Sequence, residues 1–253
     1  METQTVKVNG LNIAYNTSGS GTPLLYIHGN TGSKLWFEGV MEIEGFRTFA
    51  PDMPNFGESG HLSTADIDEY ADYMRDFILS LKMSTPLPVV GHSLGGAVAI
   101  SLALRTPELV SRLILVDSAP MEGLKTPEEH YPIIEQYKTD RNLLRQALHA
   151  VTPTMDDPGF LEKLVDQAMK MNPIAFAGNA RALERFNYQG KGRQFDKPVQ
   201  VIVGEKDVII TREMAQATAD AFPKATLKVL EGVDHSVMVE DPNTFASLIK
   251  ENS

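Results

Sequence analysis

The sequence predicts an α/β protein with a mostly parallel, eight-stranded sheet flanked by helices. Short apolar runs alternate with helical patterns along most of the 253 residues, which is typical of parallel strands connected through helices. Several runs are apolar at nearly every position, as in strands buried on both faces of a sheet. One of these runs enters a glycine-rich turn, Gly91-His92-Ser93-Leu94-Gly95, which leads directly into a helical segment.

The first two strands are predicted to form a hairpin. Polar and apolar residues alternate over 4–8 and again over 11–15, with Asn9-Gly10 between them. This dipeptide favours the tight turns that connect antiparallel strands. The remaining six strands are expected at residues 23–27, 47–50, 87–90, 112–116, 199–203 and 226–230.

Helical patterns separate most of these strands. The longest is expected to run from a cap at Ser63 or Thr64 to about Lys82, because its apolar residues recur every three or four positions. A short apolar helix is predicted over residues 97–104, after the glycine-rich turn. Two more are predicted near the end of the chain, at residues 211–222 and 242–250.

Residues 121–195 interrupt the alternation of strands and helices. We expect residues 1–120 and 196–253 to form one core domain, with 121–195 inserted between the sixth and seventh strands. The insertion holds four helical patterns, at about 127–138, 141–150, 158–171 and 173–187. Several of its residues occupy positions favoured at helix starts, namely Asp140, Asp157, Asn172, Pro158 and Pro173.

Composition restricts the partners and the location. The 33 acidic residues outnumber the 23 basic ones, for a net charge of −10, so we expect no nucleic-acid or membrane partner. The chain has no Cys, which excludes a disulfide framework or a thiolate metal site. No apolar stretch approaches the length of a membrane span, and the first residues lack the pattern of a secretory signal. We therefore expect a cytoplasmic protein; the sequence does not indicate its oligomeric state.

Four polar residues lie within a few positions after the ends of predicted strands: His28, Ser93, Asp207 and His235. The carboxyl ends of parallel strands meet at one edge of a sheet, and ligands bind beyond that edge. We therefore expect these four side chains to converge.

On these residues the sequence resembles the α/β-hydrolase family, over nearly its whole length. The matching motifs are His28-Gly29, the turn around Ser93, the Gly-x-x-Asp turn that ends at Asp207, and Asp234-His235. The order Ser, Asp, His is the one that this family uses. The resemblance implies an α/β-hydrolase fold in which Ser93 is the nucleophile, His235 the base and Asp207 the acid that orients it. It also implies that residues 121–195 are a helical cap.

These roles suit the chemistry of ester cleavage. A serine hydroxyl is a weak nucleophile until an imidazole takes its proton, and a buried carboxylate holds that imidazole in the required tautomer. We therefore predict that His235 Nε2 lies within hydrogen-bond reach of Ser93 Oγ. The tetrahedral oxyanion needs fixed donors, and the backbone amides of Asn30 and Leu94 are the expected pair.

Two positions leave alternatives. Asp117 follows the sixth strand, where some relatives place the acid, but the Gly-x-x-Asp turn favours Asp207. Asn55 stands where relatives commonly have Gly, and Asn tolerates the left-handed backbone that this turn requires. A serine nucleophile disfavours the dehalogenase and epoxide-hydrolase branches, because their chemistry uses a carboxylate.

The sequence therefore predicts a serine hydrolase, a carboxylesterase or lactonase that forms an acyl-enzyme and needs no metal or cofactor. Apolar and aromatic residues in the insertion favour a small or medium, mostly apolar ester or lactone. The expected substrate pocket comprises His28, Gly29, Trp36, Phe37 and His92. A cofactor-free haloperoxidase or perhydrolase, which uses the same three residues with peroxide, is the alternative. A non-catalytic ligand receptor is disfavoured because all three residues are present.

Overall fold

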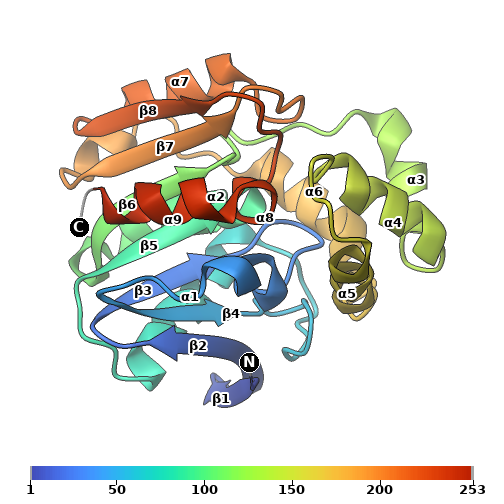
Figure 1. The fold of residues 1–253 in the computed structure, drawn as a ribbon, viewed down its shortest axis with the longest axis horizontal. Helices are drawn as coiled ribbons and strands as arrows, with labels where there is room; N and C mark the ends of the chain where they lie inside the picture. The colour runs from blue at the N-terminus through green and yellow to red at the C-terminus, as the bar shows by residue number, and fades with distance from the viewer. Residues whose placement is uncertain (1, 252–253) are drawn as a thin grey trace.

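The computed structural model describes residues 2–251 and contains the predicted eight-stranded, mostly parallel sheet (Figure 1). The strand order is β1-β2-β4-β3-β5-β6-β7-β8. The strand β2 runs antiparallel to both of its neighbours, and all other neighbouring strands are parallel. The strands are β1 (Gln4–Val8), β2 (Leu11–Gly19), β3 (Thr22–Ile27), β4 (Phe46–Pro51), β5 (Leu87–His92), β6 (Val110–Val116), β7 (Val199–Gly204) and β8 (Ala225–Leu230).

Helices cover both faces of the sheet. A 3-10 helix, η1 (Lys34–Val40), packs with α8 (Val237–Glu240) and α9 (Pro242–Lys250) on the face toward the viewer in Figure 1. On the other face, α1 (Ile67–Ser80) packs against α2 (Leu94–Arg105), and α2 lies along β5 and β6. The helix α7 (Arg212–Ala221) packs on β7 and β8 at the edge of the sheet.

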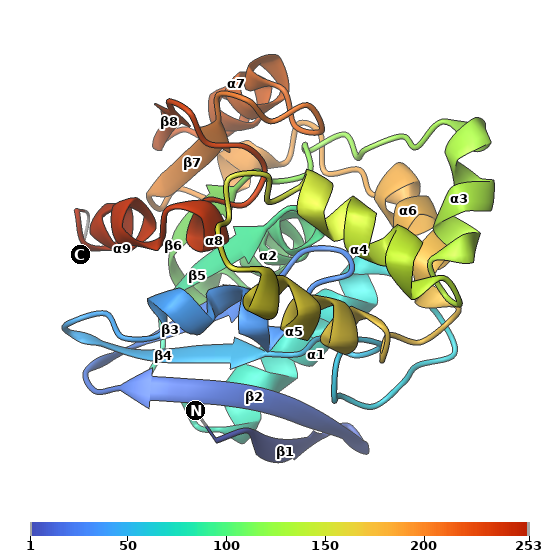
Figure 2. The same ribbon diagram turned by 45° about the vertical axis from the view of Figure 1, so that its right-hand side comes forward.

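Within the described residues, the connection between β6 and β7 contains helices, turns and loops but no strand. It contains α3 (Tyr131–Gln136), α4 (Arg141–Ala150), α5 (Pro158–Ala168) and α6 (Ala175–Arg185). Figure 2 shows these four helices grouped on one side of the molecule, the side to which the β4 arrow points. They therefore lie beyond the carboxyl ends of the strands.

Helix starts differ in part from the prediction. The α1 helix begins later than expected, because the Asp66 side chain, rather than Ser63 or Thr64, accepts the amides of Asp68 and Glu69. Asp140 and Asp157 cap α4 and α5 as predicted.

The start of α6 and two short helices also depart from the prediction. Ile174 occupies the cap position of α6, so Pro173 lies outside this helix, and the Asn172 side chain accepts the Ile174 amide from the preceding turn. The periodicity of apolar residues predicts neither η1 nor α8, because both helices are too short to show a helical repeat.

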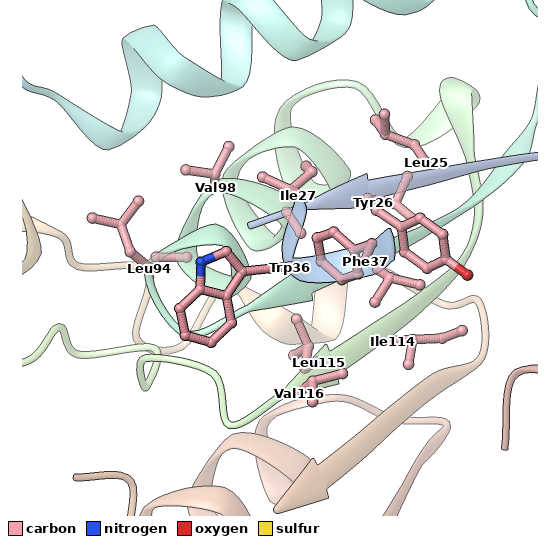
Figure 3. Close-up of a cluster of buried hydrophobic side chains, with 14 of the residues drawn as sticks. Leu25, Tyr26, Ile27, Trp36, Phe37, Leu94, Val98, Ile114, Leu115 and Val116 are labelled. Carbon is pink, nitrogen blue, oxygen red and sulfur yellow. The ribbon is translucent and has the colours of Figure 1, made fainter. Parts of the chain in front are cut away.

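Figure 3 shows a part of the core in which buried side chains of η1, α2, β3 and β6 come together. The rings of Tyr26 and Phe37 stack with their centroids 4.5 Å apart, and the Tyr26 hydroxyl donates to the carbonyl of Val40 at 2.9 Å. This packing fixes η1 against the sheet, directly after the loop that follows β3. In residues 2–251, no helix is both long enough and apolar enough to cross a membrane.

The α2 helix crosses β3 and β5 at very short range. A Cβ at Gly95 would lie 2.3 Å from the carbonyl oxygens of Ile27 and His28, and one at Gly91 would lie 2.4 Å from the carbonyl oxygen of Gly95. Backbone atoms on both sides leave no room for a methyl group. These two glycines therefore set how closely the start of α2 approaches the sheet.

Gly95→Ala should lower the free energy of unfolding by about 1–3 kcal/mol, the usual cost of overpacking a close-packed site. Gly39→Ala is the control, because a Cβ there would meet the Pro242 side chain at an ordinary 3.5 Å. Urea unfolding of both variants beside the wild type measures the difference. Equal stability of the two variants would contradict the close crossing.

Candidate active site

Ser93 lies at the sharp turn between β5 and α2. Its backbone has φ 52° and ψ −118°, a conformation that costs energy for any residue except Gly. Three backbone hydrogen bonds hold it: its N–H donates to the carbonyl of Val116, and its carbonyl accepts the amides of Gly96 and Ala119. Neighbouring strand and loop thus maintain the strained turn.

Asp207 and His235 form a buried pair at the same edge of the sheet. His235 Nδ1 lies 2.7 Å from Asp207 Oδ2, while Asp207 Oδ1 accepts the amides of Ile209 and Ile210. Because a carboxylate only accepts, Nδ1 carries the proton and Nε2 is left as the acceptor nitrogen. Burial raises the pKa of Asp207, but the hydrogen bond and charge of His235, with the two amides, outweigh burial and lower it below its usual value.

The loop that carries His235 is held by two residues that the sequence did not single out for this purpose. Glu240 on α8 accepts the amides of Asp234 and Ser236, each at 3.1 Å. His92 Nε2 donates to the His235 carbonyl at 2.9 Å. Burial lowers the pKa of His92 to about 3, so this imidazole is neutral and its Nε2–H tautomer is set by that carbonyl.

Ser93 and His235 open onto one cavity of about 250 Å³. Asn30, Trp36 and His92, all predicted at the site, also line it. Within residues 2–251, Ser93 Oγ and His235 Nε2 are not hydrogen-bonded to each other; such contacts often tighten only in the complex with substrate. Their hydrogen bond stays a prediction. The apolar part of the wall includes Leu124, Ile134, Leu144, Leu148, Val151, Leu183 and Ile209.

Three residues expected in the pocket are not among those that line this cavity. The Phe37 ring is in the core, because it stacks on Tyr26. His28 is buried behind the loop, where its Nε2 accepts the Met53 amide at 3.0 Å and burial lowers its pKa to about 4. Gly29 packs against the His92 ring, where a Cβ would be 2.9 Å from Nδ1. His28 and Gly29 therefore shape the loop that presents Asn30.

Leu94 is the first residue of α2, and N–H groups at a helix start have no acceptor within the helix. Its amide is therefore available beside Ser93.

Asp117, the alternative acid, lies beside the pair but does not bind His235. Its Oδ1 accepts the Gly204 amide at 2.9 Å. One carboxylate oxygen each of Asp117 and Asp207 and one ring nitrogen of His235 all lie within 4.8 Å of one another. Burial, and then the charge of Asp207, raise the pKa of Asp117 well above its usual value. These shifts favour the protonated form of Asp117 and the ionised form of Asp207.

The sequence matches a known family over most of its length. A model described as the alpha/beta hydrolase family matches residues 24–248. The chain belongs to this family. The hydrolase is 29% identical over 244 residues to Lipase 1 of Psychrobacter immobilis, an alignment that covers 90% of this chain and 75% of that protein.

Solved structures share the fold of this hydrolase. An esterase from Exiguobacterium antarcticum superposes with a TM-score of 0.87 at 21% identity, over 97% of each chain. An enol-lactonase from Burkholderia xenovorans LB400 superposes with a TM-score of 0.86 at 19% identity, over 97% of this chain and 98% of the other. The resemblance inferred from the motifs is therefore confirmed for the family and the fold.

The opposite pKa shifts of the two acids predict opposite pH effects on stability. The pKa of Asp117 is raised in the folded protein, so the contribution of this group to stability falls as pH rises above about 3.9, the usual pKa of an Asp in an unfolded chain. Asp117→Asn does not titrate and should gain stability relative to the wild type over the same range. Urea unfolding of both proteins between pH 4 and 8 measures this difference.

Asp207→Asn provides the comparison of opposite sign. The pKa of Asp207 is lowered in the folded protein, so the wild type holds extra stability above about pH 3.9 and loses it as pH falls through the lower folded-state pKa. The variant should therefore be the less stable protein near neutral pH. Differences of the same sign for both variants would contradict the assigned charges.

Proposed function

We propose that this α/β hydrolase is a serine hydrolase that cleaves a small or medium, mostly apolar carboxylic ester or lactone. The observation that carries the proposal is the meeting of Ser93, on its strained turn, with the Asp207–His235 pair at one apolar cavity. A cavity of about 250 Å³ is slightly smaller than the roughly 300–1,000 Å³ typical of drug-sized ligands, which favours short acyl or alcohol groups.

The proposed reaction follows from the tautomer of His235. Its Nε2 takes the proton of Ser93 as Oγ attacks the ester carbonyl, and Asp207 stabilises the imidazolium that forms. The amides of Asn30 and Leu94 donate to the oxyanion. His235 then protonates the leaving alkoxide, and a water molecule, activated by the same imidazole, hydrolyses the acyl-enzyme.

We further propose that residues 121–195 are a cap on a core formed by residues 1–120 and 196–253. Support comes from side chains of this segment, such as Leu124, Leu144 and Leu183, which line the cavity together with Ser93. The named relatives, a lipase, an esterase and an enol-lactonase, agree with an ester or lactone substrate. Location in the cytoplasm stays a prediction.

Ser93→Ala should reduce kcat/KM for p-nitrophenyl esters and lactones of graded chain length by about 10⁴-fold or more. Ser101→Ala is a suitable control, because Ser101 is a buried serine of α2 that hydrogen-bonds Asp68 rather than lining the cavity. Retained activity in Ser93→Ala, or labelling of another residue by an organophosphonate, would contradict the nucleophile. Assays with peroxide and a carboxylic acid test the perhydrolase alternative.

Asp207→Asn should lower kcat by about 10⁴-fold, because the imidazole loses the carboxylate that sets its tautomer. Asp117→Asn should change kcat by less than about tenfold, since the Asp117 carboxyl binds the Gly204 amide rather than His235. Steady-state kinetics of the two variants ranks them directly. The reverse ranking would assign the orienting role to Asp117.

A further inference from the structure

The Asn30 side chain, on the cavity wall, is held by two donors. The Thr31 N–H donates to Asn30 Oδ1 at 3.0 Å, and Asn179 Nδ2 donates to the same oxygen at 2.9 Å. A backbone N–H can only donate, so the Thr31 bond identifies this atom as the carboxamide oxygen. The NH₂ group of Asn30 is the other end of the amide, and within residues 2–251 it donates to no protein acceptor.

A buried chain of hydrogen bonds fixes this orientation from behind. Asn179 lies on α6, and its Oδ1 accepts from the Tyr70 hydroxyl at 2.9 Å. Asn55 Nδ2 donates to the Tyr70 oxygen at 3.1 Å. Burial raises the pKa of Tyr70, which keeps the proton that it donates. Asn55, Tyr70 and Asn179 are all fully buried.

The far end of the chain is fixed independently. Asn55 Oδ1 accepts the backbone amide of Leu62 at 2.7 Å and Asn172 Nδ2 at 2.9 Å. As at Asn30, the backbone donor identifies the oxygen and therefore places the Asn55 NH₂ toward Tyr70. Every bond then donates in the same direction, toward Asn30. Reversal of the Asn30 amide would set its NH₂ against two donors, which a buried network does not tolerate.

We infer that the Asn30 NH₂ group is a preset hydrogen-bond donor to substrate, and that the enzyme prefers esters or lactones with an acceptor oxygen near the reacting carbonyl. This inference rests on the proposed function, in which Ser93 is the nucleophile, because Asn30 and Ser93 line the same cavity. Most of the remaining wall is apolar. A substrate oxygen near Asn30 can therefore accept a hydrogen bond there, whereas a hydrocarbon chain of the substrate cannot. Asn179, Tyr70 and Asn55 are positioning residues for this donor.

The preference is measured with p-nitrophenyl methoxyacetate and p-nitrophenyl butanoate, which differ by one ether oxygen in place of a methylene. The preference ratio is kcat/KM for the methoxyacetate over kcat/KM for the butanoate, divided by the same ratio of their spontaneous hydrolysis rates. Asn30→Ala and Asn179→Ala should lower this ratio by roughly fivefold, the size expected of one neutral hydrogen bond. The change should appear in KM for the methoxyacetate, because the bond forms in the ground state as well.

Tyr70→Phe tests the positioning role without touching the cavity wall. It removes only the hydroxyl that donates to Asn179 and should shift the ratio in the same direction. Tyr188→Phe is the matched control, because it removes a buried hydroxyl that binds Ser101 and Asp68, outside the network. An unchanged ratio in Tyr70→Phe, or an equal shift in Tyr188→Phe, would overturn the positioning role.

A binding measurement separates this inference from the proposed function. In Ser93→Ala, the ¹⁵N–¹H signals of the Asn30 side chain should shift on titration with methyl methoxyacetate and much less with methyl butanoate. Equal shifts, or an unchanged kinetic ratio in Asn30→Ala, would overturn the inference while leaving ester hydrolysis intact. Absence of ester hydrolysis by the wild type would instead refute the proposed function, and the titration would still test Asn30.

Discussion

The close crossing of α2 over β3 and β5 is the constraint on which the candidate site depends. Gly91 and Gly95 allow it, because any Cβ there would lie within 2.4 Å of a backbone oxygen. The crossing imposes an unfavourable backbone conformation on Ser93, which hydrogen bonds to Val116, Gly96 and Ala119 maintain. It also places Ser93 at the edge where the loops after β7 and β8 bring Asp207 and His235.

Burial then decides which groups around Ser93 carry charge. It lowers the pKa of His28 to about 4 and of His92 to about 3, so neither imidazole is protonated near neutral pH. It raises the pKa of Asp117, which favours the protonated form of this acid. Asp207 differs because His235 and two backbone amides bind its carboxylate. Negative charge is therefore concentrated on the group that contacts the proposed base.

Asn55 connects the helical segment between β6 and β7 to the rest of the protein. Its φ of 75° is the left-handed conformation expected where relatives have Gly, but glycine has no side chain to extend the network. Through its carboxamide, Asn55 binds Asn172, which precedes α6, and Tyr70 on α1. The same residue that permits the turn thus connects the helical segment between β6 and β7 to α1 and to the loop after β4.

Apolar periodicity and glycine-rich turns are local signals, so the residue pattern was enough to predict the eight strands, the turn at Ser93 and the family. It also placed Asp207 and His235 after the correct strands. Three-dimensional packing was needed to show that Phe37 lies in the core and that Asp66 caps α1, and to show that Asp207 rather than Asp117 contacts His235. It alone brought Asn179 to Asn30, which are 149 residues apart. Such contacts depend on how helices and strands pack, and no local pattern of residue types specifies that.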